Sequence, residues 1–140
     1  MTLADIQRWT PIKPTFIYRA KFIRAIDGDT VVMEIDQGLY QFAIRRVRIL
    51  GVNCPEMKGR TKAAGIAAKQ ATEAWFRMRG NIVIQTHPDP EQHEDDFGRW
   101  LADVWGDYLG NNQDSLGDHL LAHGHATPYA KKKRAKKTVK

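Results

Sequence analysis

Apolar residues recur at two spacings along the chain, and the change of spacing separates strands from helices. Residues 16–26, 31–35 and 40–50 are rich in β-branched and aromatic side chains, which predicts three β-strands. In the third run the apolar positions change parity where Arg45 and Arg46 stand side by side. We therefore expect a β-bulge at these two arginines.

The middle of the chain has the period of a helix. Within residues 63–79, apolar side chains three or four positions apart form one stripe, and Gly80 follows where helices commonly end. Residues 81–86 and 100–105 predict two further strands, with a polar, proline-containing loop between them. The chain thus alternates between the two periods rather than keeping one throughout.

A second, shorter helix is predicted near the end of the chain. Asp114 or Ser115 is expected to cap it, and Gly124 follows its last residue, His123. The order is then three strands, a helix, two strands and a helix. This order is typical of a five-stranded OB-fold barrel, an α+β β-barrel with about two to three α-helices. Other five-stranded barrels and half-open sheets share it, so the pattern alone leaves them open.

The length and composition of the chain indicate one folded domain. A chain of 140 residues, 42% hydrophobic and 27% charged, has the make-up of a globular protein with one core. We expect an arm at residues 1–14, an OB-fold domain at 15–130 and a basic disordered tail at 131–140. No apolar run approaches the roughly 20 residues that a bilayer-spanning helix needs.

The positive charge of the chain resides in its last ten residues. The net charge is +6, and residues 131–140 contain seven Lys or Arg and no acid, against 15 basic and 16 acidic residues elsewhere. Such a block attracts polyanions, of which nucleic acid is the commonest. A tail that only improves solubility is the alternative. On the first interpretation, four of its residues are nucleic-acid-binding candidates: Lys131, Lys132, Lys133 and Arg134.

The single cysteine and the N-terminal residues bear on the compartment. Cys54 has no intramolecular partner, which suits a reducing cytosol. The first residues lack the basic start and apolar stretch of a secretory signal. We expect a cytoplasmic monomer with no membrane association and no partner protein, or a secreted protein if a signal has been removed from the sequence.

Four charged residues fall at predicted strand ends, where a scaffold fixes side-chain geometry. Asp29 lies in the first turn, Arg48 on the third strand, Glu56 just after it, and Arg99 at the start of the fifth. A carboxylate can hold a divalent cation, a second carboxylate can take a proton from water, and arginine matches phosphate oxygens. This set suffices for phosphodiester hydrolysis. Each residue also has a plain interpretation: Asp29 bracing its turn, Arg48 and Glu56 solvated, and Arg99 paired with the acids of residues 94–96.

Three segments in order resemble the signature segments of the staphylococcal nuclease (thermonuclease) family. They are AIDGDTV at residues 25–31, RVRILGVNCPE at 46–56 and DDFGRWLADVW at 95–105, and the similarity runs from residue 16 to 129. The resemblance implies an OB barrel with helices. It also implies Ca²⁺-dependent hydrolysis of DNA and RNA that leaves 3′-phosphates.

The same resemblance assigns roles to individual positions. Asp29 matches the family's first metal-binding aspartate, and Arg48 and Arg99 match its two phosphate-contacting arginines. Glu56 matches the catalytic glutamate that acts on water. Cys54 falls where the family uses a backbone carbonyl as a metal ligand, which any residue type can supply.

Asn53 departs from the family pattern, which has a metal-binding aspartate at this position. An amide still offers one oxygen, but the site loses a full negative charge, so weaker calcium binding is expected. Three outcomes follow: a nuclease that needs more Ca²⁺, a nuclease that uses another divalent ion, or a catalytically weakened nucleic-acid-binding or adaptor module. We favour the metal-dependent endonuclease, and a protein-binding OB module is a third, less favoured hypothesis.

Two further groups of residues have weaker functional interpretations. Tyr129, just before the basic tail, lies near the position of nucleotide-contacting tyrosines in the family, so base stacking and simple packing are both open. His119 and His123, four residues apart on the predicted helix, could hold Zn²⁺, but solvated histidines fit the pattern better.

Overall fold

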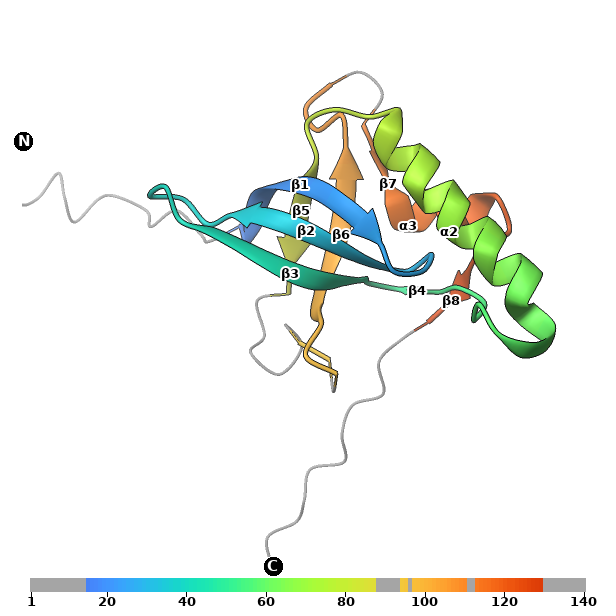
Figure 1. The fold of residues 1–140 in the computed structure, drawn as a ribbon. Coiled ribbons are helices and arrows are strands. Elements are labelled where there is room, and N and C mark those ends of the chain that lie inside the picture. The colour runs from blue at the N-terminus through green and yellow to red at the C-terminus, as the bar shows by residue number, and fades with distance from the viewer. Residues whose placement is uncertain (1–14, 88–93, 96, 111–112, 130–140) are drawn as a thin grey trace, which may run out of the picture.

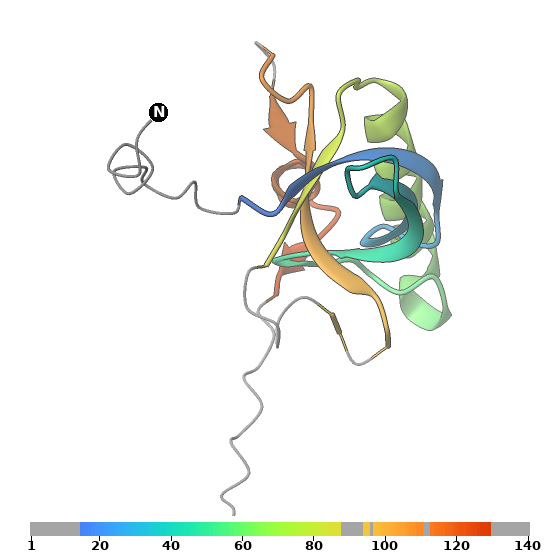
Figure 2. The ribbon, with the colours of Figure 1, turned by 90° about the vertical axis from the view of Figure 1, so that its left-hand side faces the viewer.

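Five strands close into a mixed β-barrel in the computed structural model, which describes residues 15–87, 94–95, 97–110 and 113–129 (Figures 1 and 2). Successive antiparallel pairings join β1 to β2 and β2 to β3, and β5 pairs antiparallel with both β1 and β6. A short parallel pairing between β3 and β6 closes the barrel. This architecture confirms the predicted OB-fold α+β class. The barrel strands are β1 Ile17–Ala25, β2 Thr30–Asp36, β3 Phe42–Ile49, β5 Val83–Thr86 and β6 Trp100–Gly106.

Two helices and several short elements pack around this barrel. Helix α2, Lys62–Arg77, follows the 3₁₀ turn η1, Gly59–Thr61, and confirms the helix predicted from the apolar stripe. Helix α3, Leu116–Ala122, begins after Ser115, whose hydroxyl accepts the N–H of Asp118 at 3.3 Å. The short strands, which the sequence pattern did not predict, are β4 Val52–Asn53, β7 Asp114–Ser115 and β8 Thr127–Pro128.

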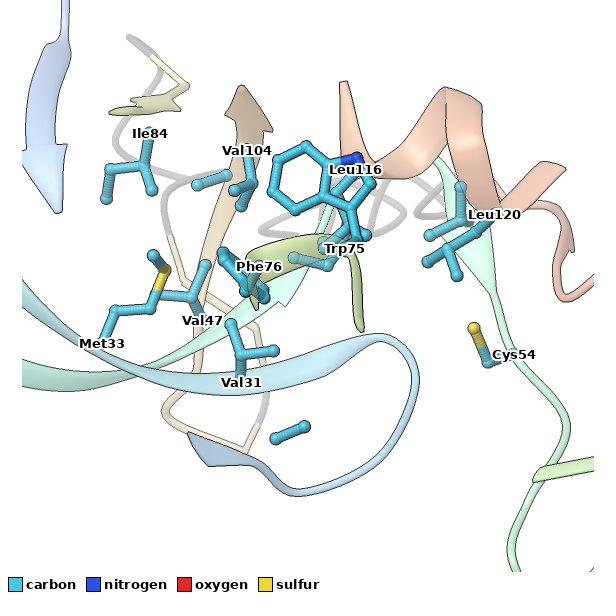
Figure 3. Close-up of a cluster of buried hydrophobic side chains, with 14 of the residues drawn as sticks. Val31, Met33, Val47, Cys54, Trp75, Phe76, Ile84, Val104, Leu116 and Leu120 are labelled. Atoms are coloured by element: carbon cyan, nitrogen blue, oxygen red, sulfur yellow. The ribbon is translucent and has the colours of Figure 1, made fainter. Parts of the chain in front are cut away.

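The core is formed by side chains from the barrel strands and from both helices, α2 and α3 (Figure 3). Trp75 on α2 is 1% exposed, and its neighbour Phe76 stacks on Phe22 of β1 with the ring centroids 4.2 Å apart. Val31 and Val104 are fully buried on the barrel strands. Burial of these apolar side chains fixes the barrel against α2, and the loops at the barrel ends are held with it.

One strand irregularity was placed wrongly. The pairing of β3 with β2 is regular from Phe42 to Arg48, so β3 has no bulge at the adjacent arginines, and the register shift lies in β1 between Phe22 and Arg24. The change of parity has another cause. Phe42 and Ile44 are exposed, on the outer face of the barrel, so apolar character does not mark the inner face there.

Some expectations concern parts of the chain that are not described. The arm at residues 1–14 and the basic tail at 131–140 both lie outside the described residues. Among the helices of the described residues, none combines the length and apolar character that a membrane span requires.

Gly65 sets the distance between α2 and the loop that carries Glu56. A Cβ atom at this position would lie 2.6 Å from the Glu56 carbonyl oxygen and 2.8 Å from the Met57 nitrogen. Gly65→Ala should therefore lower the free energy of unfolding by about 1–3 kcal/mol, although the same change in an open helix raises it. Urea denaturation measures the effect, with Gly80→Ala as the control because no atom other than an Asp107 oxygen at 4.0 Å approaches its Cβ. A stabilised Gly65→Ala variant would contradict this packing.

Candidate active site

A cleft of about 490 Å³ lies where the β1–β2 turn, the end of β3 and the segment before β6 meet. The structure brings together in it every predicted site residue that it describes. The four tail residues, Lys131 to Arg134, lie outside the described part of the chain. The cleft is lined by Asp27, Asp29, Arg48, Asn53, Cys54, Pro55, Glu56, Asp95, Phe97, Arg99, Leu101 and Tyr129.

Asp29 is buried at the end of the β1–β2 turn and ties this turn to the segment after β4. Its Oδ2 accepts the backbone N–H of Cys54 at 2.8 Å and lies 3.4 Å from Nη2 of Arg48. Its Oδ1 accepts the hydroxyl of Thr30 at 3.3 Å. The carboxylate thus braces the local structure and also lies in the wall of the cleft.

Arg48 is 8% exposed and is held from several sides. Its Nη1 donates to the carbonyl oxygens of Ile49 at 3.0 Å and Val52 at 2.8 Å. Its Nη2 donates to the amide Oδ1 of Asn53 at 3.4 Å. Because the guanidinium is fixed by backbone groups, it presents a cation at a defined place in the cleft.

Arg99 approaches the cleft from the start of β6. Its Nε lies 2.5 Å from Oδ2 of Asp95, and its Nη1 donates to the Thr30 hydroxyl at 3.2 Å. Asp95 also accepts the backbone N–H groups of Phe97 and Arg99, each at 2.9 Å. The plain interpretation of Arg99 as the partner of an acid in residues 94–96 is therefore confirmed, and the same ion pair orients its guanidinium beside Thr30.

Glu56 differs from the other charged residues of the cleft because it is largely exposed. Its side chain is 72% exposed, and its Oε2 lies 3.7 Å from Nζ of Lys58, which is 81% exposed. A surface ion pair of this kind contributes little to stability. The carboxylate of Glu56 is accordingly free to contact water at the mouth of the cleft.

Asp27 is a cleft residue that sequence reasoning missed. Its Oδ1 accepts the N–H of Asp29 at 3.1 Å, and burial followed by the nearby Asp29 carboxylate raises its pKa to about 6. In solution more acidic than this, the Asp27 carboxyl is protonated and adds no negative charge to the cleft. The signal was present in the sequence, since Asp27 opens the segment DGDT, but the motif assigns a role only to Asp29.

The acid and amide groups of the cleft form an oxygen-rich donor set. Two carboxylates, those of Asp27 and Asp29, and the amide of Asn53 line the same cleft. Ca²⁺ takes carboxylate and amide oxygens together with carbonyls and water, so the donor chemistry fits a hard divalent ion. No group of three acid, histidine or cysteine side chains suited to a metal occurs in the described residues, which limits the negative charge available.

The thiol of Cys54 does not belong to this reactive chemistry. Cys54 is 6% exposed, and burial together with the charges of Asp29 and Asp27 raises the pKa of its thiol to about 12. A thiol with this pKa has almost no thiolate at neutral pH. Cys54 therefore contributes its backbone N–H, which Asp29 accepts, and not a nucleophilic thiol, while the role of its carbonyl as a metal ligand stays a prediction.

Two exposed aromatic rings flank the two arginines. The ring of Tyr129 lies 5.7 Å from the guanidinium carbon of Arg48, and the ring of Phe97 lies 5.2 Å from that of Arg99. Phe97 is 79% exposed and Tyr129 is 52% exposed, so both rings have open faces. Phe97 was missed because its motif was used only to locate Arg99.

The histidines of the second helix lie apart from the cleft. The rings of His119 and His123 stack with centroids 4.2 Å apart, and His123 Nδ1 lies 2.9 Å from the His119 carbonyl oxygen. Burial, followed by the nearby His123, lowers the pKa of His119. Among the described residues, no third acid, histidine or cysteine side chain joins this pair in a group that could hold a metal.

Two curated proteins are similar to this chain over different lengths. An uncharacterized protein of Methanocaldococcus jannaschii is 27% identical over 131 residues, which covers 80% of this chain and 59% of that protein. The thermonuclease of Staphylococcus hyicus is 34% identical over 85 residues, which covers 61% of this chain and 47% of the thermonuclease. The chain thus spans about half to three-fifths of the length of these relatives.

A family model gives the broader relationship. The model described as "Staphylococcal nuclease homologue" matches residues 46–140, which include Arg48, Asn53, Glu56 and Arg99. The match covers more than half of the chain, and the barrel with its two helices agrees with it. The chain therefore belongs to the family of staphylococcal nuclease homologues.

Proposed function

We propose that this protein is a metal-dependent nuclease that hydrolyses phosphodiester bonds within DNA, RNA or both. The observation that carries the proposal is one cleft that holds two arginines, a buried aspartate and a water-exposed glutamate. These side chains come from the β1–β2 turn, the end of β3, the loop after β4 and the start of β6. Family membership and the similarity to a thermonuclease support the same class of reaction.

The proposed roles follow from the position and chemistry of each side chain. Arg48 and Arg99 bind the non-bridging oxygens of the scissile phosphate and stabilise the charge that builds up as water attacks phosphorus. Glu56 accepts the proton of the attacking water, since its exposed carboxylate is accessible to solvent. Tyr129 and Phe97 offer open ring faces on which flanking bases stack.

A divalent ion, with Ca²⁺ the expected one, would be held by Asp29, Asn53 and the carbonyl of Cys54, and Asp27 stands next to them. When bound, such an ion neutralises phosphate charge and polarises the P–O bonds. Asp29 is already oriented for this purpose by the N–H of Cys54 and the hydroxyl of Thr30. Asn53 brings an oxygen without a charge, and this oxygen also accepts a hydrogen bond from Arg48.

The neutral Asn53 also favours a second candidate function, a nucleic-acid-binding or adaptor module whose cutting activity is weakened. In that case the cleft keeps its two arginines and still binds phosphate, but the divalent ion binds too weakly to act. The two candidates share the fold and the cleft and differ in the charge of one ligand. A substitution at this position therefore separates them.

Asn53→Asp should raise the affinity of the cleft for Ca²⁺ by about tenfold or more, because one full negative charge is added to the ligand set. Isothermal titration measures binding, and cleavage of single-stranded and plasmid DNA with increasing Ca²⁺ measures activity, with a chelator as the blank. Asn81→Asp, the same chemical change at an exposed site outside the cleft, is the matched control.

The outcomes distinguish the two functions. Chelator-sensitive cutting by the wild-type protein supports the nuclease. DNA binding without cutting, with cutting restored by Asn53→Asp, supports the weakened module. Absence of binding to both DNA and RNA at low salt contradicts both proposals.

A further inference from the structure

The outer face of β1, β2 and β3 carries a row of side chains that begins at the cleft. In this sheet, residues directly opposite each other share a face, and residues two apart on a strand share a face. Arg48 lies opposite Thr30 and Arg46 opposite Val32. The row on β3 therefore runs outward from Arg48 through Arg46 and Ile44 to Phe42, in steps of about 6.6 Å.

Basic side chains dominate the charge of this face. Arg24 lies opposite Val32, and Lys21 lies opposite Glu34, which places both on the same outer face as Arg46. Arg19 shares it by strand alternation. The acids on this face are Glu34 and Asp36 of β2. The face therefore carries two carboxylates and four cations, namely Arg19, Lys21, Arg24 and Arg46. In the described part of the chain, none of the four cations lies within 4.0 Å of a carboxylate oxygen, so their charges are available to an anionic partner.

Exposed apolar and aromatic side chains continue the row at its far end. Phe42 is 57% exposed and Ile44 is 62% exposed, and both project from β3. The turn that follows β2 presents Leu39, which is 92% exposed, and Tyr40, which is 95% exposed. The β2–β3 hairpin projects on the side of the barrel away from α2 (Figure 1). Nothing in the described residues covers these rings.

The turn itself is held in a costly conformation. Leu39 and Tyr40 have φ angles of 53° and 58°, in the left-handed region that bulky side chains rarely adopt. Hydrogen bonds from Gln37 N–H to the Gln41 carbonyl and from Gln41 N–H to the Gly38 carbonyl hold it there. The sequence thus keeps two large apolar side chains at a strained, solvent-exposed position, where they contribute little to stability.

We propose that this outer face is an extended binding track for single-stranded polynucleotide, which continues from the cleft along β3 to the tip of the β2–β3 hairpin. Cations in register with open aromatic rings suit a polyanion whose bases are unstacked, and a duplex hides the base faces that Phe42 and Tyr40 would contact. The track rests on the proposed function, because it takes the strand that the cleft is proposed to cut.

Charge and continuity favour nucleic acid over a second copy of this chain. A second copy brings the same excess of cations, whereas a polynucleotide neutralises it. The row also meets the phosphate-binding arginine of the cleft, Arg48, without interruption by an acid on β3. A surface that only serves self-association has no need for that connection.

The test compares labelled oligonucleotides of about 4 and about 16 nucleotides, the range of single OB-fold sites. Fluorescence anisotropy at low salt, with a chelator present to prevent cutting, measures binding by the wild-type protein and by the Phe42→Ala/Arg46→Gln variant. The variant should bind the long oligonucleotide at least about fivefold more weakly and the short one with unchanged affinity. Arg77→Gln/Met78→Ala, which removes one exposed cation and one exposed apolar side chain at the C-terminal end of α2, is the matched control.

The binding results test the track, and the cleavage results test the proposed nuclease activity. A loss of binding that affects only the long oligonucleotide supports the track, whether or not the protein cuts. Absence of cutting with every divalent ion would count against the proposed nuclease and not against the track. Equal binding of long and short oligonucleotides, unchanged affinity of the variant, or no binding of the long one overturns the track. Cleavage of the short oligonucleotide then shows independently whether the nuclease proposal stands. Light scattering that shows a wild-type dimer and a monomeric variant, with oligonucleotide binding unchanged, assigns this face to self-association instead.

Discussion

Replacing Glu56 with glutamine is expected to lower the rate of phosphodiester cleavage by about 10²–10⁴-fold, the usual loss when a general base is removed. Glutamine has almost the same shape but cannot accept the proton of the attacking water. The side chain is 72% exposed and pairs only loosely with Lys58, so its loss should change the free energy of unfolding by less than about 0.5 kcal/mol. Glu56→Gln is therefore expected to lower the cleavage rate strongly and to leave the free energy of unfolding almost unchanged.

The measurement is the initial rate of cleavage of a short single-stranded substrate at saturating divalent ion, with urea denaturation of the same samples. Glu73→Gln on α2 provides the matched control, because it makes the same chemical change outside the cleft. A Glu56→Gln variant that cuts at the wild-type rate would remove this residue from the mechanism. Equal loss in the control would point to a general effect of charge.

The order of the strands and helices was predictable from the sequence because the two kinds of element have distinct periods, whereas the choice of the OB barrel also rested on the resemblance to the nuclease family. The apolar stripe of residues 63–79 became α2, and Ser115 caps α3 as its side chain predicts. The alternation of apolar residues failed to predict which side chains of β3 point into the barrel, because tertiary packing decides which face of a strand is buried. Phe42 and Ile44 are apolar yet exposed, so their parity indicated a bulge that β3 does not have.

Only part of the membership of the site was predictable, since Asp27 and Phe97 were missed. The resemblance to the nuclease family identified residues that do line one cleft, Arg48 and Glu56 among them, but it contains no information on their contacts in the folded chain. The hydrogen bonds of Arg48 to the carbonyls of Ile49 and Val52 depend on the path of the folded backbone, and the raised pKa of Asp27 arises from burial and the nearby Asp29. Backbone path and burial are properties of the folded chain, so these features could not be predicted from the sequence.

Replacing Arg48 with alanine is expected to lower the free energy of unfolding by about 3–5 kcal/mol, the usual cost of removing one partner of a buried ion pair. The side chains of Arg48 and Asp29 are 10% and 9% exposed. The change leaves the Asp29 carboxylate buried without its cation, and it removes the donors to the carbonyls of Ile49 and Val52. Such a loss is a large part of the 5–15 kcal/mol that stabilises a typical domain.

Urea denaturation at neutral pH measures this loss, with Arg46→Ala as the control. Arg46 lies two residues earlier on the same strand and face but is exposed, so its replacement should cost less than about 0.5 kcal/mol. If the loss comes from the uncompensated carboxylate, adding Asp29→Asn to Arg48→Ala should recover part of it, as a double-mutant cycle would show. An Arg48→Ala variant as stable as the Arg46→Ala control would mean that Asp29 does not depend on this guanidinium. The N–H of Cys54 and the hydroxyl of Thr30, which Asp29 also accepts, would then suffice to hold its carboxylate in the wall of the cleft.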